Sequence, residues 1–115
     1  MKLTYHHTGI HVPARAARVP VRIEFYRDPL YDTFGLDPSD YPRVFADPGA
    51  RSKHRMPTDD ALCLYDVRDP AEKRWTSEKG LQSLLVMVAD HLFYEDIWRD
   101  SGKWPVPDAP HGFQR

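Results

Sequence analysis

Hydrophobic and polar residues alternate along the segment "VPVRIEFY", residues 19–26. A period of two is the pattern of a strand with one buried face. The segment "YPRVFADP" gives a second short strand, predicted at residues 42–47. Residues 3–12 can supply an earlier edge strand, with "HTG" as a possible turn. The first half of the chain is therefore predicted to form an antiparallel meander.

Proline restricts the first half of the chain further. The sequence holds 11 prolines, and through Pro70 they recur every few residues. Proline interrupts helices, so no long helix is expected there, and none across residues 19–48. The apolar run "ALCLYDV" is a third candidate for an extended segment, but it is too short to distinguish a strand from an extended loop.

The period changes between residues 76 and 101, where no proline occurs. Leucine and valine recur there with the i, i+3, i+4, i+7 spacing of one helix face, continuing loosely to Glu95 and Trp98. This pattern predicts a helix that dominates residues 77–101. Thr76 or Ser77 is expected to cap its start, and Gly102 suits the left-handed position after its end.

The opposite face of the predicted helix also carries apolar residues. These apolar residues predict one of two things: a bend or break of the helix near Asp90, or contact with a partner, including self-association through this helix. The residues are Val86, Met87, Phe93 and Ile97. Residues 1–18 are expected to form an N-terminal edge segment, and the proline-rich residues 103–115 an extended tail. The expected organisation is one domain spanning residues 1–115, in keeping with its length.

Composition narrows the function classes. A formal net charge of −1 gives no electrostatic argument for a nucleic-acid partner or an anionic membrane surface. No stretch approaches the ~18 consecutive apolar residues of a membrane span. The sequence contains one cysteine, which excludes an internal disulfide and fits a reducing compartment. The expectation is a soluble cytoplasmic protein.

Histidines and acidic residues offer little chemistry of their own. The six histidines show no recurring zinc-ligand spacing, so they are interpreted as scattered surface residues, with no metal and no cofactor predicted. Four acidic residues flank Cys63, and we interpret them as solvated turn residues rather than as catalytic groups. They are Asp59, Asp60, Asp66 and Asp69. Cys63 itself, between two leucines, is on composition alone most often an inert small hydrophobe.

The order of elements changes that interpretation, because it resembles ubiquitin-conjugating enzymes. "DYPRVFADP" is similar to that family's Tyr-Pro segment, His54 to the histidine of its His-Pro-Asn motif, and Cys63 to its catalytic cysteine. Trp75 resembles the tryptophan that follows, over a resemblance spanning roughly residues 19–111. "LFYEDIWRDSGKWP" is more similar to a bacterial branch that serves ubiquitin-like conjugation in anti-phage operons, including the cyclic-oligonucleotide (CBASS) type.

The resemblance implies an α+β fold, with an antiparallel meander packed on a C-terminal helix, in a minimal form that lacks the family's N-terminal helix. It implies that Cys63 carries a ubiquitin-like modifier as a thioester. The implied partners are that modifier, an activating enzyme and a JAB-type peptidase. Strict alternation would turn Leu62 and Leu64 inward and an exposed Cys63 outward, while His54 orders the loop by hydrogen bonding rather than acting as a base.

Two features of the motifs differ from the family. The triplet His54-Arg55-Met56 lacks the asparagine, and Asp59-Asp60-Ala61 stands where the family usually has glycine. An alternative of another class is therefore a non-catalytic binding module that keeps the fold and recognises a modifier or partner. An unrelated small α+β protein is the third interpretation.

Overall fold

The alternating segment forms the central strand of the sheet, β2 (Val19–Tyr26). The computed structural model describes residues 1–107. The side chains of Val19, Val21 and Ile23 are buried on one face of the strand, as their spacing predicts. β2 pairs antiparallel with β1 (Lys2–Ile10) on one side and β3 (Arg43–Phe45) on the other, so the strand order is β1-β2-β3. The strand predicted at residues 42–47 is present but shorter.

The edge strand β1 contains an irregularity where the sequence predicted a turn. The "HTG" tripeptide lies inside the strand, and the register with β2 shifts between His7 and Ile10. A Cβ atom on Gly9 would lie 2.6 Å from the Cβ of Arg18, so only glycine fits this close approach. The reversal between β1 and β2 falls in residues 11–18, and the prediction of a turn at "HTG" is wrong.

The predicted helix is α1 (Gly80–Ser101), preceded by a 3₁₀ turn, η2 (Ser77–Lys79). Thr76 precedes that turn without a side-chain capping bond, and the residue before α1 is Lys79, so the predicted cap at Thr76 or Ser77 is wrong. Gly102 does end the helix in the left-handed conformation (φ 80°), as expected. The helix runs without interruption through Asp90, contrary to the predicted bend or break. On its outer face Val86 is 52% exposed, whereas Met87, Phe93 and Ile97 are half-buried.

One further helical turn was not expected from the proline spacing. η1 (Pro38–Asp40) is a three-residue 3₁₀ helix within residues 19–48. Proline is tolerated at its first position because that N–H needs no helical partner. The carboxylate of Asp37 accepts a hydrogen bond from the N–H of Ser39 at 2.9 Å and caps the turn.

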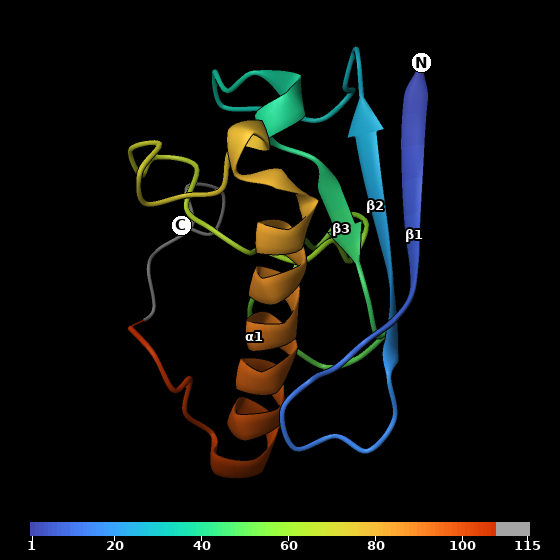
Figure 1. Cartoon of the computed structure of the whole chain (residues 1–115). Coiled ribbons are helices and arrows are strands. Elements are labelled where there is room, and N and C mark those ends of the chain that lie inside the picture. Colours follow the sequence, from blue (N-terminus) through green and yellow to red (C-terminus); the bar gives the residue numbers. More distant parts are fainter. Residues whose placement is uncertain (108–115) are drawn as a thin grey trace.

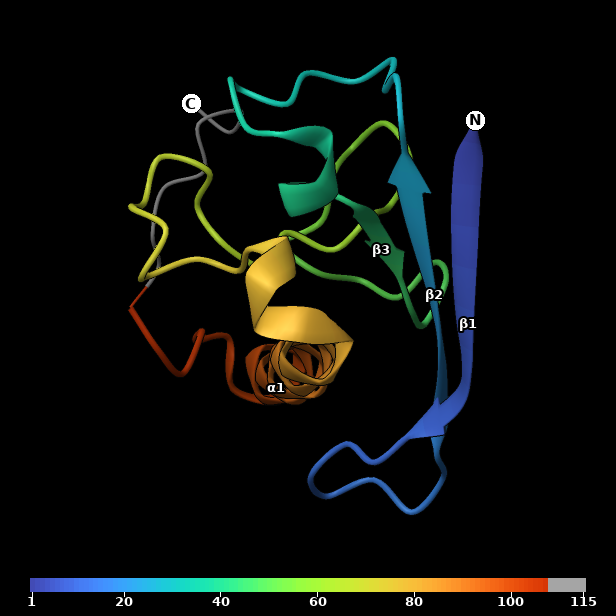
Figure 2. The same cartoon turned by 45° about the horizontal axis from the view of Figure 1, so that its top comes forward.

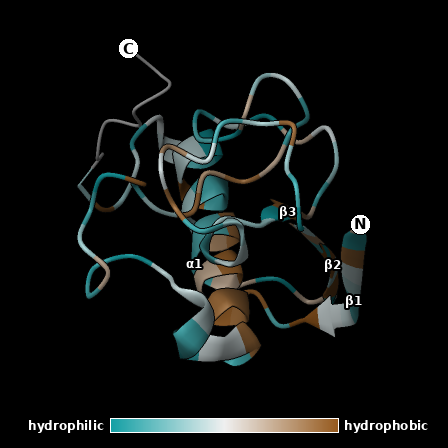
Figure 3. Cartoon of the chain, turned by 90° about the horizontal axis from the view of Figure 1, so that it is seen from above, coloured by the Kyte–Doolittle hydropathy of each residue, from teal (hydrophilic) through white to brown (hydrophobic). Residues whose placement is uncertain are grey.

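The molecule has two layers, with α1 lying across one face of the sheet (Figures 1 and 2). The view in Figure 3 shows hydrophobic segments both on α1 and on the neighbouring strands. Trp75 is 2% exposed in this core, and its indole N–H donates to the carbonyl of Gly80 at 3.0 Å. The α+β prediction is confirmed. Within residues 1–107, no helix combines the length and apolarity needed to cross a membrane. The buried core consists of Ile10, Val12, Val19, Val21, Ile23, Val44, Ala46, Leu62, Trp75, Leu84, Leu85, Val88 and Leu92.

Candidate functional site around Cys63

Cys63 closes a short hairpin-like loop that begins at His54. The N–H of Cys63 donates to the carbonyl of His54 at 3.0 Å, and Arg55 forms an isolated antiparallel bridge with Leu62. The N–H of Leu62 donates to the carbonyl of Val44 at 2.9 Å, which attaches the loop to β3. The two residues predicted for the site are therefore brought together by backbone pairing, and Cys63 directly follows the bridge.

The acidic turn before Cys63 has a defined structural role. Asp60 adopts a φ of 68°, a left-handed conformation that glycine favours and aspartate tolerates. Its carboxylate accepts hydrogen bonds from the Gly49 N–H at 3.0 Å and from Arg55 at 3.1 Å. Asp59 accepts from the Ala61 N–H at 3.1 Å. Both carboxylates stay partly exposed to solvent, and they also hold the turn in shape.

The other two flanking acids contact their own local segment. Asp66 is buried and accepts a hydrogen bond from Arg68 at 2.8 Å. The backbone N–H of Asp69 donates to the carbonyl of Asp66 at 3.0 Å, closing a turn after the Cys63 segment.

The thiol of Cys63 is buried, with 8% of the residue exposed. The prediction of an outward-facing thiol is therefore wrong for this conformation. Leu62 on one side of it is also buried and Leu64 is half-buried, so strict alternation does not hold. Burial raises the pKa of Cys63 to about 12, against the opposing charge of Arg43. At neutral pH the sulfur is a protonated thiol.

Cys63 and His54 line the same pocket, of about 220 Å³, between the loop and α1. Its wall is completed by residues after the helix, among them Trp104, whose ring centroid lies 4.4 Å from that of His54 in an edge-on arrangement. The N–H of His54 donates to Ser52 Oγ at 3.1 Å, so its backbone contributes to the order of the loop. The pocket is lined by His54, Cys63, Leu64, Tyr65, Asp66, Met87, Asp90, His91, Tyr94, Trp104, Val106 and Pro107.

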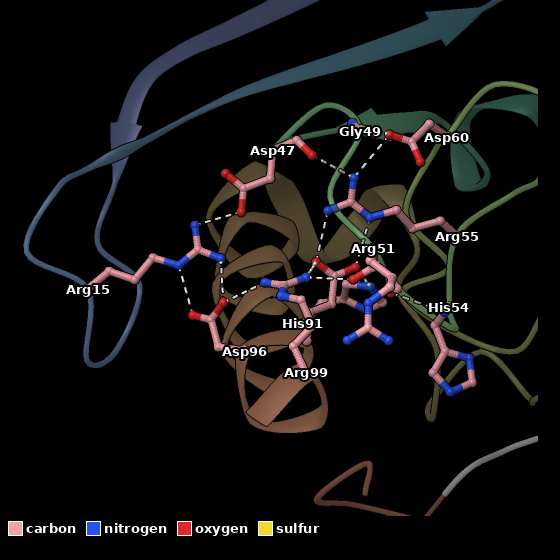
Figure 4. A network of polar contacts seen from close by, with 12 residues as sticks. Arg15, Asp47, Gly49, Arg51, His54, Arg55, Asp60, His91, Asp96 and Arg99 are labelled. Atoms are coloured by element: carbon pink, nitrogen blue, oxygen red, sulfur yellow. Dashed lines mark hydrogen bonds and ion pairs between the residues drawn. The ribbon is translucent and has the colours of Figure 1, made fainter. Parts of the chain in front are cut away.

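A buried polar network lies beside this pocket (Figure 4). Glu95, with no exposed surface, accepts hydrogen bonds of 2.8 Å from Nε and Nη2 of Arg55. His91 Nε2 lies 3.2 Å from the same carboxylate. Burial opposes ionisation, but the hydrogen bonds from Arg55 and His91 outweigh it and lower the pKa of Glu95 to about 2. Glu95 is therefore ionised at neutral pH.

The sequence interpretation missed this network. Both His54 and His91 are buried, so describing all histidines as surface residues is wrong. A signal was present, because His91 and Glu95 lie four residues apart near the predicted buried stripe of the helix. Arg55, which bonds Glu95 across 40 residues of sequence, carried no such signal.

Other histidines do not join the site. His6 and His11 are exposed, and His7 is half-buried in β1. His111 lies outside the described residues. Among residues 1–107, no group of three or more histidine, cysteine, aspartate or glutamate side chains is arranged to hold a metal ion.

A second set of ion pairs ties the turn between β1 and β2 to α1 (Figure 4). Arg15 donates to both oxygens of Asp96 at 2.8 Å and lies 2.6 Å from a carboxylate oxygen of Asp47. Arg99 contacts Asp96 at 2.6 Å and donates to the carbonyl of Arg51 at 2.7 Å. These contacts fix the C-terminal half of α1, which carries His91 and Glu95, against the segments before the Cys63 loop.

Comparison with known proteins gives one family. A family model described as type II CBASS E2 protein matches residues 7–112, which is nearly the whole chain and includes Cys63 and its pocket. Neither the curated proteins nor the solved structures contain a match to the chain. A match of this extent shows the family and agrees with the bacterial branch to which the C-terminal segment is similar. The chain belongs to the type II CBASS E2 protein family.

Proposed function

We propose that the protein is a thioester carrier in a bacterial ubiquitin-like conjugation pathway. Cys63 accepts the C-terminal acyl group of a ubiquitin-like modifier from an activating enzyme and passes it to an amine. The observation that carries the proposal is the position of the chain's single cysteine in a pocket shared with His54, within a chain of an E2 family. A JAB-type peptidase is the partner proposed to reverse the modification, and the cytoplasm is the proposed location.

The proposed chemistry is two successive acyl transfers. In the first, the Cys63 thiol loses its proton, its sulfur attacks the thioester carbonyl on the activating enzyme, and that enzyme's thiol leaves. In the second, an amine attacks the carbonyl on Cys63, a C–N bond forms, the C–S bond breaks, and the sulfur departs as thiolate and takes up the proton that the nitrogen loses. Sulfur suits both steps, because thiolate is a strong nucleophile and a good leaving group.

The residues around Cys63 suggest how the two steps differ. The triplet His54-Arg55-Met56 has no asparagine to donate to the oxyanion formed when an amine attacks. Losing one oxyanion donor costs roughly a hundred- to a thousand-fold in rate in other acyl-transfer enzymes. Loading can proceed with donors from the activating enzyme. The protein is therefore expected to load Cys63 but to discharge slowly onto free lysine until a partner completes the site.

The test combines the protein with ATP, a cognate activating enzyme and the modifier. A band of higher mass that disappears with reducing agent is the expected result, and Cys63→Ser should give a reductant-resistant ester. Cys63→Ala is the matched variant that forms no adduct. Absence of any adduct with the cognate partners would remove the carrier function. Immediate discharge onto free lysine would remove only the argument from the missing asparagine.

The burial of Cys63 favours a second candidate, a non-catalytic module that binds a modifier or partner. In that case a protonated, enclosed thiol needs no further explanation. Calorimetric titration with the cognate modifier distinguishes the two candidates. If the protein is a binding module, the unmodified chain and Cys63→Ala bind the modifier equally well and neither forms an adduct. If it is a carrier, the unmodified chain forms the adduct and Cys63→Ala does not.

A further inference from the structure

The chain turns back on itself immediately after α1. Gly102 takes the left-handed conformation, and its N–H donates to the carbonyl of Trp98 at 2.8 Å. The Ser101 hydroxyl accepts a hydrogen bond from the N–H of Lys103 at 3.2 Å, which orders the reversal. The following residues rise beside the helix toward the loop that carries Cys63 (red in Figure 1). The reversal is a defined turn, and it aims the next residue, Trp104, at the pocket.

Trp104 is the anchored residue of the segment Lys103–Pro107. Its ring contacts His54 at 4.4 Å, His91 at 5.4 Å and Tyr94 at 6.0 Å between centroids, each in an edge-on arrangement. Pairs of this geometry are attractive beyond the apolar area that they bury. In contrast, Lys103 and the three residues after Trp104 are exposed. Within residues 1–107, the segment is thus held chiefly by one indole.

The same segment forms one wall of the pocket that holds the cysteine. Trp104, Val106 and Pro107 line the pocket together with Cys63 and His54. Cys63 is buried, although it directly follows a loop bridge at the edge of the sheet. The other boundaries of the pocket are α1 and the Cys63 segment itself, which belong to the packed body. The Lys103–Pro107 segment is therefore the wall that can move without unfolding the domain.

We propose that the segment Lys103–Pro107, anchored by Trp104 against His54, His91 and Tyr94, is an autoinhibitory cover that must be displaced before Cys63 can react. Its hinge is the Ser101–Gly102 turn. Displacing the indole admits water and reagent to the pocket and removes apolar surroundings that keep the sulfur neutral. The part of this inference that concerns regulation of acyl transfer rests on the proposed function. The part that concerns access to the Cys63 thiol depends on this chain alone.

The test measures how fast Cys63 reacts with 5,5′-dithiobis(2-nitrobenzoate) in the native protein. The sequence has one cysteine, so the released chromophore reports on Cys63 without ambiguity. The expected result is a slow reaction for the unmodified chain and a roughly 10- to 100-fold faster one for Trp104→Ala, equivalent to losing one or two aromatic pairs. The acceleration should persist unchanged at low urea concentrations, because it reports a local opening.

Two matched variants distinguish loss of the cover from a general loss of stability. Trp98→Ala removes the same side chain from α1, where it packs under Arg51 and does not line the pocket. A chain ending at Pro107 removes residues 108–115 and leaves the segment in place. Both should react at the unmodified rate. A Trp104→Ala rate equal to the unmodified rate would overturn the proposal, as would equal acceleration by Trp98→Ala at matched stability.

The loading assay with the cognate activating enzyme and modifier then distinguishes the two proposals. If Trp104→Ala speeds thiol labelling but no thioester forms on any variant, the carrier function fails and the control of thiol access stands. If the thioester forms equally fast on the unmodified chain and on Trp104→Ala, the autoinhibitory role fails and the carrier function stands. Faster loading of Trp104→Ala supports both.

Discussion

Arg55 holds the carboxylate of Glu95 through two hydrogen bonds of 2.8 Å, and solvent reaches almost none of either side chain. Both members of the pair make further hydrogen bonds. Arg55 donates to the carbonyl of Asp47 at 2.9 Å and to Asp60, while His91 contacts Glu95. This pair joins the loop that carries His54 and Cys63 to α1, so the position of the thiol depends on it.

Removing one partner of this pair should be costly. In Glu95→Gln the buried Arg55 guanidinium keeps only the partly exposed Asp60 as a counter-charge, and a loss of about 3–5 kcal/mol in the free energy of unfolding is expected. Urea denaturation measures it. The double variant Arg55→Met/Glu95→Leu should recover most of the loss, because it leaves no buried charge. Asp96→Asn, in a half-exposed pair, is the control and should cost less than the first variant. A loss below ~1 kcal/mol for Glu95→Gln would contradict the role given to the pair.

Acid should weaken the protein through the same carboxyl. The pKa of Glu95 lies at about 2 in the folded state, below its ordinary value of 4.5. A depressed pKa gives stability that is complete above the unfolded value and is lost as pH falls toward the folded one, here from about pH 5 to about pH 2. The loss attributable to Glu95 is up to about 3 kcal/mol. Unfolding free energies of the unmodified chain and of Glu95→Gln should converge over this range, and parallel curves would contradict the assignment.

Alkali should weaken the protein through Cys63. Its pKa is about 12 in the folded state against an ordinary value of 9.0. A raised pKa on an acid means that the unfolded thiol ionises first, so stability is complete below pH 9 and falls as pH rises toward 12. Relative to Cys63→Ala, the unmodified chain should lose about 2 kcal/mol between about pH 8 and about pH 10.5. Tyrosine ionisation affects both chains and cancels in the difference. No change in that difference would show that the thiol is not enclosed in solution.

The turn at Asp60 gives a test of backbone conformation. With φ at 68°, Asp60→Ala suffers left-handed strain and loses the carboxylate contacts, whereas Asp60→Gly loses only the contacts. Asp60→Ala should therefore be less stable than Asp60→Gly by about 1 kcal/mol, with Asp60→Asn the most stable of the three. Thermal or urea unfolding of the set checks the order. Equal stability of the alanine and glycine variants would place Asp60 in an ordinary conformation.

Local pattern was enough to predict most of the fold. The alternation in residues 19–26 and the helical spacing from Leu81 to Leu92 identify β2 and α1, since each element buries one face. The left-handed end of α1 at Gly102 was predictable because glycine adopts positive φ angles without strain. The irregularity near Gly9 was not predictable, because it depends on the approach of Arg18 across the turn.

The candidate site was predictable only in part. The family motifs identified His54 and Cys63, and the structure places them in one pocket. The burial of Cys63 was not foreseen, since alternation within a short apolar run says nothing of the distant parts of the chain that pack around it. Trp104, 41 positions after Cys63 by their numbers, supplies part of that enclosure. The burial of Glu95 depended likewise on a guanidinium from another part of the chain.

The position of α1 after all three strands in the sequence has a consequence for biosynthesis. A ribosome completes the sheet before it makes the helix that covers the sheet's inner face. Until then the nascent strands expose Val19, Val21 and Ile23, and exposed apolar strand residues promote aggregation. Contacts such as that between Arg15 and Asp96 span 81 residues and form late as well. Folding of this domain is therefore expected to await the synthesis of α1, with the nascent sheet relying on chaperones in the meantime.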